Sequence, residues 1–201
     1  MLNRLVSPAF AILFAVPSAF AAVPAGVARQ LPPGYDVLGS ASMRVGVPAR
    51  SVVILALGRD GDSNTKRSEV HAPARPLVIF AQRPRGGFTR IGCNDTVVNR
   101  ADEGGQCDPF LDGGGVIAVR GPFFTVQNGV ACGAQHWTDY VTFRFDGERG
   151  GFVFDNERSE SWKLNPSRDP NAEAVVRDGP PRLRRGDAGH AVGFDAWRPE
   201  R

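Results

Sequence analysis

Residues 139–145 show the clearest alternation of apolar and polar side chains along the chain. From residue 140 onward, apolar residues occupy the three odd positions, and residues with polar groups occupy the three even positions. The apolar set is Val141, Phe143 and Phe145, and the polar set is Tyr140, Thr142 and Arg144. A period of two is that of a β-strand with one buried face. The Gly- and Asp-containing residues 146–150 that follow predict a hairpin turn.

Other short apolar runs recur at roughly ten-residue spacing, which predicts further strands. These runs are rich in Val, Ile and Phe and are separated by Gly- and Pro-containing stretches. They lie at residues 35–42, 51–57, 76–82, 88–91, 116–119, 123–126, 152–154 and 161–164. We therefore expect a mainly β fold, an antiparallel β-sandwich or curled sheet of about eight strands.

One short C-terminal helix is expected after Asp169, which can cap it, with Pro170 at the first helical position and Gly179 as its terminator. The β-rich domain is then expected to span residues 35–178. The Pro- and Ala-rich residues 22–34 predict a linker before it, and the Arg-rich residues 179–201 predict an exposed basic tail after it.

The first 21 residues have the pattern of a secretory signal peptide. Arg4 is followed by an apolar run, and Ala19-Phe20-Ala21 supplies a small-x-small cleavage site. Pro8 and Pro17 interrupt the run, whereas a membrane-spanning helix needs ~20 consecutive apolar residues. We therefore expect cleavage before Ala22, a mature chain without a membrane span, and a periplasmic location.

Composition narrows the function classes. The 201 residues are 42% hydrophobic and 22% charged, which is ordinary for a folded domain with a core. Lys and Arg total 24 against 21 Asp and Glu, too even a balance to predict nucleic-acid binding. Phosphate-binding loops, zinc-protease helices, haem-attachment pairs and nucleophile elbows are absent from the sequence. We therefore expect no cofactor and no metal.

Four stretches have a distinctive wording and order, at residues 101–110, 123–133, 136–146 and 160–165. They resemble a group of small exported proteins of Gram-negative bacteria that are described as hypothetical proteins or lipoproteins. The resemblance covers residues 35–165 and implies the fold and the export, but no reaction. Some members carry an acidic turn between the first two strands. Here residues 42–50 contain no carboxylate, so no metal site is carried over.

Three cysteines are an odd count for an oxidising compartment. Loop-closure entropy barely separates the pairings, at ~3.5 kcal/mol for Cys107–Cys132 and ~3 kcal/mol for Cys93–Cys107. Only Cys107 and Cys132 lie in the stretches that resemble the family, and the resemblance therefore implies a Cys107–Cys132 disulfide. Cys93 follows an apolar strand and is expected to be a buried thiol.

Two partial metal motifs are weak. Residues 60–64 match the first half of a calcium loop, but the twelfth position holds His71 instead of a carboxylate. We read this stretch as a solvated turn, and weak cation binding stays open. Cys132 and His136 have the spacing of a metal or thiol–imidazole pair. A metal site needs three or four ligands, however, and the other histidines, His71 and His190, lie in polar segments.

His136, Trp137, Asp139 and Tyr140 gather an imidazole, two aromatic rings and a carboxylate at the entrance of a strand. As a binding site they would form a recognition patch. As an active site, His136 and Asp139 would form a general-base pair. If these residues have only a structural role, Trp137 would cover the end of the hydrophobic core. We expect Trp137 to be partly core and His136 to be exposed at the edge of a groove.

The sequence thus favours an exported, non-catalytic periplasmic protein that binds another macromolecule, a protein or an envelope component, through its loops. An inhibitor or immunity protein against an envelope-attacking enzyme is one such role, by analogy alone. The alternatives are a periplasmic hydrolase that uses His136 and Asp139, and a structural envelope accessory protein.

Overall fold

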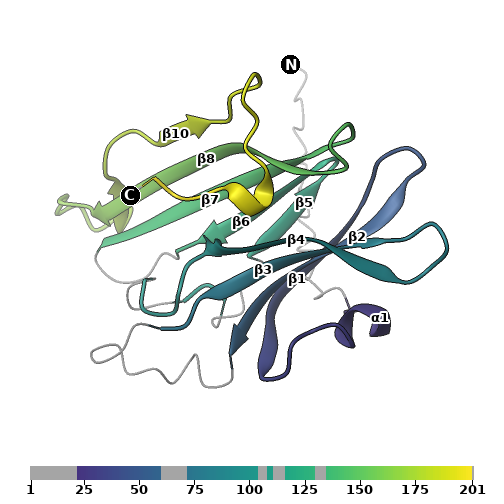
Figure 1. Ribbon diagram of the computed structural model, residues 1–201. Helices are drawn as coiled ribbons and strands as arrows, with labels where there is room; N and C mark the ends of the chain where they lie inside the picture. Colours follow the sequence, from purple (N-terminus) through teal and green to yellow (C-terminus); the bar gives the residue numbers. More distant parts are fainter. Residues whose placement is uncertain (1–21, 60–71, 104–107, 111–115, 130–134, 201) are drawn as a thin grey trace, which may run out of the picture.

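The computed structural model describes residues 22–59, 72–103, 108–110, 116–129 and 135–200, and for residues 135 and 136 it describes only the backbone. The fold is mainly β and consists of two antiparallel sheets that pack face to face (Figure 1). The expected fold class is confirmed. In the described part of the chain, no helix is long and apolar enough to cross a membrane.

The first sheet has four strands in sequence order, β1 to β4. They are β1 (Tyr35–Val45), β2 (Arg50–Arg59), β3 (Arg75–Gln82) and β4 (Phe88–Val98). The second sheet has the order β10-β8-β7-β6-β5, and a short β9 also pairs with β8. Its strands are β5 (Ile117–Arg120), β6 (Phe123–Asn128), β7 (Gln135–Asp146), β8 (Gly151–Leu164), β9 (Val175–Arg177) and β10 (Arg182–Arg185).

The core between the sheets is built from alternate residues of the facing strands. On β7, Val141, Phe143 and Phe145 are all buried, as the period of two predicts. Phe143 stacks on Phe124 of β6, with ring centroids 5.2 Å apart. The expected runs at residues 152–154 and 161–164 belong to one strand, β8, which carries a register shift opposite Thr142 and Phe143.

The four-stranded sheet is apolar on both faces. On β2, Val52 and Ile54 point into the core between the sheets, whereas Val53 and Leu55 join a second cluster on the outer face. The N-terminal segment covers part of this outer face. The expected linker at residues 22–34 is therefore wrong, because it holds helix α1 (Ala25–Ala28), whose Val27 is fully buried in the second cluster.

The expected exposed tail at residues 179–201 is also wrong. β10 pairs with β8, and the 3-10 turn η2 (Phe194–Ala196) fills the open side between β4 and β8. Phe194 and Trp197 are buried in the core. The Asn94 side chain donates to the carbonyls of Phe194 at 2.6 Å and of Trp197 at 3.0 Å. The C-terminal segment is therefore part of the domain.

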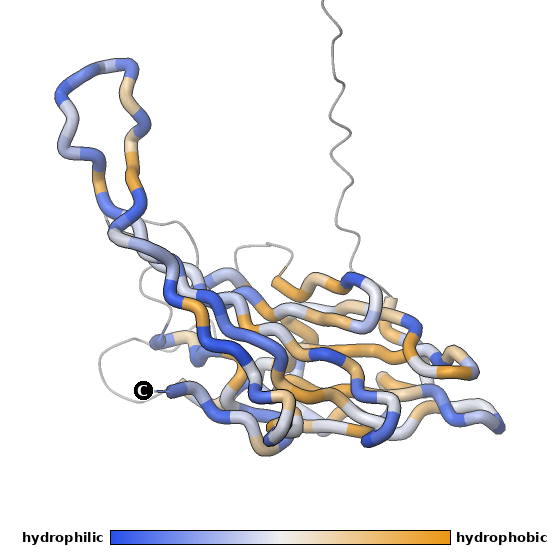
Figure 2. Tube along the Cα trace, turned by 90° about the horizontal axis from the view of Figure 1, so that it is seen from above, coloured by the Kyte–Doolittle hydropathy of each residue, from blue (hydrophilic) through white to orange (hydrophobic). Residues whose placement is uncertain are grey.

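The short helix lies at η2 and not after Pro170, where it was expected. Asp169 therefore caps no helix; its carboxylate accepts the Asn171 backbone N–H at 2.9 Å in a local turn. The chain then turns back as β9 along the end of β8. In Figure 2 this hairpin projects from the body and is mostly hydrophilic. Pairing with β8 satisfies the backbone groups that a helix would have paired within itself.

Candidate functional site

Trp137 and Asp139 lie together near the base of the projecting hairpin. The alternation of β7 puts both on the same face as Val141 and Phe143, which are buried in the core. Trp137 and Asp139 are half-buried. Trp137 was expected to be partly core; it is half-buried, but the described residues of the two hydrophobic clusters do not include it. Tyr140 lies on the other face of the strand, so the four residues singled out in the sequence do not form one patch.

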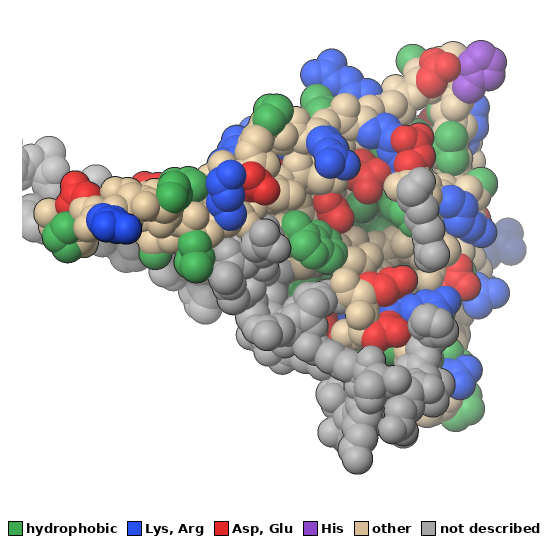
Figure 3. Space-filling model, turned by 90° about the vertical axis from the view of Figure 1, so that its left-hand side faces the viewer, with side chains coloured by type: hydrophobic (Ala, Val, Ile, Leu, Met, Phe, Trp, Pro, Cys, Tyr) green, Lys and Arg blue, Asp and Glu red, His purple; other side chains and the backbone are tan. Residues whose placement is uncertain are grey.

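A cleft of about 290 Å³, called here the polar cleft, contains Trp137 and Asp139. Its other lining residues come from β8, from β10 and from the segment between β9 and β10. They are Ser159, Glu160, Ser161, Asp178, Pro180 and Arg182. This end of the molecule is seen in Figure 3, where acidic and basic side chains are intermixed.

The Asp139 carboxyl is partly buried in the polar cleft. Burial raises its pKa, while a hydrogen bond from Ser159 and the positive charge of Arg182 oppose the rise. The two other acidic residues of the cleft have cationic partners. Asp178 lies 2.8 Å from the Lys163 ammonium, and Glu160 is ion-paired with two arginines, Arg158 and Arg177.

The His136 side chain lies outside the described part of the chain, and its backbone pairs with Trp162 across β7 and β8. The catalytic pair His136–Asp139 therefore stays a hypothesis. Cys107, Cys132 and residues 60–64 also lie outside the described residues, so the disulfide and the cation loop stay predictions. Among the described residues, no group of three His, Cys, Asp or Glu side chains could hold a metal ion.

Cys93 is exposed, so the expectation of a buried thiol is wrong. It pairs in register with Val78 on the outer face of the four-stranded sheet. There it borders a groove of about 440 Å³ that is also lined by Tyr35 and Phe80. Partial burial against this groove raises the pKa of the Cys93 thiol, and the nearby Arg90 charge only partly opposes it. A raised pKa disfavours the nucleophilic thiolate.

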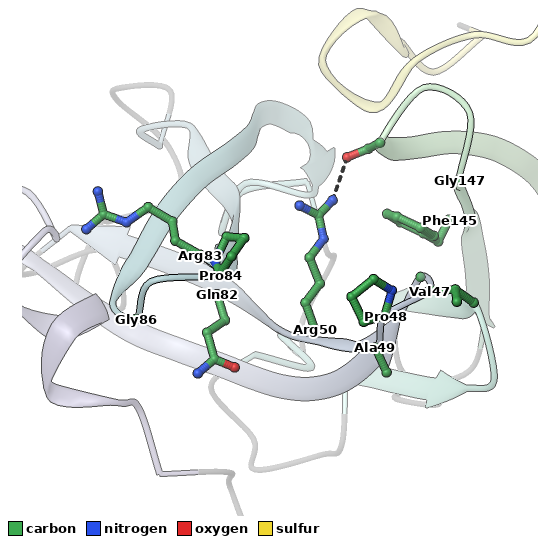
Figure 4. A pocket seen from close by; sticks show the side chains of 12 residues that line it. Val47, Pro48, Ala49, Arg50, Gln82, Arg83, Pro84, Gly86, Phe145 and Gly147 are labelled. Atoms are coloured by element: carbon green, nitrogen blue, oxygen red, sulfur yellow. Dashed lines mark hydrogen bonds between the residues drawn. The ribbon is translucent and has the colours of Figure 1, made fainter.

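A larger cleft, of about 600 Å³, lies at the opposite end of the molecule, where hairpin turns from both sheets meet (Figures 1 and 4). We call it the hairpin cleft. It is lined by the β1–β2 turn, the β3–β4 turn, the β7–β8 turn and the side chain of Phe145. Sequence reasoning identified the turns at residues 83–87 and 146–150, but it did not show that turns of different sheets converge.

Arg50 crosses the hairpin cleft. Its guanidinium donates to the Gly150 carbonyl at 2.9 Å and lies 5.6 Å from the centre of the Phe145 ring. Figure 4 shows Arg50 between Phe145 on one side and the Arg83–Pro84 turn on the other. Val47, at the tip of the β1–β2 turn, is fully exposed. The hairpin cleft therefore has an apolar wall that includes Val47 and Phe145, and Arg50 contacts both the Phe145 ring and the β7–β8 turn.

The turns around the hairpin cleft are basic. Residues 44–50, 83–87 and 146–150 contain five arginines and two acidic residues. The arginines are Arg44, Arg50, Arg83, Arg85 and Arg149. Arg149 is 3.6 Å from Asp146, so one acidic residue is already paired within its turn. This end of the molecule thus presents a positive surface, although the net charge of the chain is only +3.

Comparisons with protein-family models, with curated proteins and with solved structures found no match for this chain. The resemblance to small exported proteins stays a prediction, and the geometry of the two clefts is the basis for proposing a function.

Proposed function

We propose that this is an exported, non-catalytic protein that docks a partner protein at the hairpin cleft. The observation that carries the proposal is the convergence of three hairpin turns from two sheets around Arg50 and Phe145. Binding residues are commonly found on loops that a rigid scaffold positions. Here the scaffold is the aromatic core directly beneath, since the Phe145 ring packs on Phe152 with centroids 5.5 Å apart.

The chemistry of the hairpin cleft favours an acidic protein as the partner. Arginine and aromatic residues are enriched in the energetic centres of protein interfaces. The exposed arginines, including Arg83 and Arg85, would steer a negatively charged surface towards the apolar wall. Inhibition of an envelope-attacking enzyme would be one use of such a surface, because a loop cluster can close an active-site cleft.

The hydrolase alternative is less well supported. Of its two proposed catalytic side chains, only Asp139 is described, and it lies in a cleft with Ser159 and Arg182. The proposal of a binding protein needs only side chains whose positions are described.

The location follows from the predicted signal peptide and is part of the proposal. We expect the secreted form to begin at Ala22, because cleavage after Ala21 fits the small-x-small pattern. Intact-mass measurement of protein from the periplasmic fraction tests this. Retention of Met1, or recovery of the protein from the cytosol, would contradict export.

A photo-crosslinking amino acid at position 47 tests the docking surface. We expect one dominant covalent adduct with a partner protein in the periplasm of the producing bacterium, because Val47 is fully exposed at the rim of the hairpin cleft. The matched control is the same amino acid at position 164, since Leu164 is another exposed apolar residue, at the distal end of β8. It should give no such adduct.

Charge reversal tests whether the crosslink at position 47 depends on the basic rim of the hairpin cleft. The double variant Arg83→Glu/Arg85→Glu should reduce the adduct at position 47 by about tenfold or more, because it replaces attraction with repulsion at the rim. The fold should survive, since both arginines are exposed in a turn. An adduct that forms equally well in this variant, or that forms only at position 164, would contradict docking at the hairpin cleft.

A further inference from the structure

The polar cleft has a chemistry different from that of the hairpin cleft. Its side chains include three carboxylates, a guanidinium, two hydroxyls and an indole. It can therefore both donate and accept hydrogen bonds, and it offers an aromatic surface beside them. At about 290 Å³ it lies just below the ~300–1,000 Å³ that is usual for ligand pockets. Such a volume suits one small ring of a ligand.

The polar side chains are ordered by the sheet itself. Asp139 of β7, Ser159 of β8 and Arg182 of β10 are direct partners in register across three adjacent strands. Adjacent strands lie ~4.8 Å apart, so these side chains form a row with an acceptor at one end, a hydroxyl in the middle and a donor at the other end. Ser161, the partner of Trp137, adds a second hydroxyl in the neighbouring row.

The indole of Trp137 is held firmly against the backbone. Gly129 has a φ of +79° and lies so close that a Cβ there would be 2.8 Å from the Trp137 ring and would also clash with the Trp137 carbonyl oxygen. Only glycine accommodates both the positive φ and this close approach. Trp137 is also half-exposed and lines the cleft. It therefore offers a ligand a preformed aromatic surface.

The charges of the polar cleft nearly cancel. Asp178 is neutralised by Lys163 on β8, and Glu160 by two arginines, as described above. Asp139 and Arg182 then leave one negative and one positive charge in the same row. A cationic ligand would meet Arg182, and an anionic ligand would meet Asp139. The arrangement therefore favours a neutral ligand that can use both groups through hydrogen bonds.

We infer that the polar cleft binds one neutral sugar ring of a glycan, with the ring stacked on Trp137 and its hydroxyls bonded along the row Asp139–Ser159–Arg182. A sugar ring has an apolar face of C–H groups and a polar edge whose hydroxyls both donate and accept. That combination matches an indole beside a row of mixed donors and acceptors. This inference is independent of the partner proposed for the hairpin cleft.

Isothermal titration calorimetry with neutral sugars tests the inference on the purified exported protein. The probes are glucose, galactose, mannose, N-acetylglucosamine and the β1,4-linked dimer of N-acetylglucosamine. We expect saturable binding of at least one of them. Trp137→Ala and Asp139→Asn should each weaken that binding by about tenfold, whereas Trp137→Phe should keep much of it because the aromatic surface remains.

Two controls separate a lost site from a lost fold. Val47→Ser lies at the other end of the molecule and should bind the sugar with unchanged affinity. Asp139→Asn keeps the shape of the side chain, so its thermal unfolding should stay cooperative. Absence of saturable binding to every probe would overturn the inference, as would binding that Trp137→Ala and Asp139→Asn leave unchanged. Neither outcome bears on the crosslinks at position 47.

Discussion

Replacing Trp197 with alanine should lower the free energy of unfolding by ~3–5 kcal/mol, the usual cost of removing a buried aromatic side chain. Trp197 is 3% exposed, although it lies only four residues from the end of the chain. Its ring centroid is 5.8 Å from that of Phe143 and 5.9 Å from that of Phe154. Removing it would leave a cavity on the open side of the sandwich.

Urea unfolding of the purified protein measures this loss, and Trp162→Ala is the matched control. Trp162 lies on the projecting part of β8 and is half-exposed, with Arg177 5.1 Å from its ring centre. Its replacement should cost clearly less than that of Trp197. If Trp197→Ala unfolded at the same urea concentration as the wild type, the C-terminal segment would not be docked in solution, and the expectation of an exposed tail would be restored.

The strands could be predicted from the sequence because each carries its own local signal. The alternation at residues 139–145 gives the buried face of β7 correctly. The continuous apolar runs of β2 and β3 were also recognised as strands. These strands are apolar on both faces because α1 and the neighbouring Val23 and Leu31 pack on the outer face. The sequence of the strands alone did not predict this packing. A covered outer face removes the alternation that a one-sided strand would show.

The C-terminal segment shows why composition misled. Arg182, Arg184 and Arg185 resemble a solvated basic tail when read as a run. In the fold, Arg184 lies 2.9 Å from Glu200 and hydrogen-bonds Glu157 of β8 at 2.9 Å. Its guanidinium also covers the Phe154 ring, 4.8 Å from the ring centre. Glu157 and Phe154 lie on the neighbouring strand β8, and Glu200 lies 16 residues further along the chain. The sequence alone does not show that these residues are close to Arg184.

The candidate sites were predictable only in part. Trp137 and Asp139 were singled out, and both line the polar cleft. Ser159 and Arg182 were missed as their partners, because cross-strand neighbours are fixed by register and not by sequence spacing. The strand period of two also explains why Tyr140, one residue from Asp139, lies on the other face. Residues that are adjacent in a strand point to opposite faces, so adjacency in the sequence does not predict a shared site.

The other large effect is expected at a buried ion pair. Arg75 of β3 is 1% exposed, and its guanidinium pairs with Asp108, which is 7% exposed. Arg75 also donates to the Asn99 carbonyl at 3.3 Å, and Asp108 accepts the Phe110 backbone N–H at 3.0 Å. Arg75→Met should therefore lower the free energy of unfolding by ~3–5 kcal/mol, because it removes the Arg75 cation from its buried ion pair with the Asp108 carboxylate.

A double-mutant cycle shows whether the cost comes from charge or from packing. In Arg75→Met/Asp108→Asn no charge is left at the buried pair, while the asparagine oxygen can still accept the Phe110 N–H. We expect urea unfolding to show the double variant as more stable than Arg75→Met alone, with a coupling free energy of ~1–3 kcal/mol. If the two single losses simply added, the ion pair would contribute no coupling. The stability at this point would then come from the packing of the Arg75 side chain on Phe110, whose ring centre lies 5.9 Å from the guanidinium carbon.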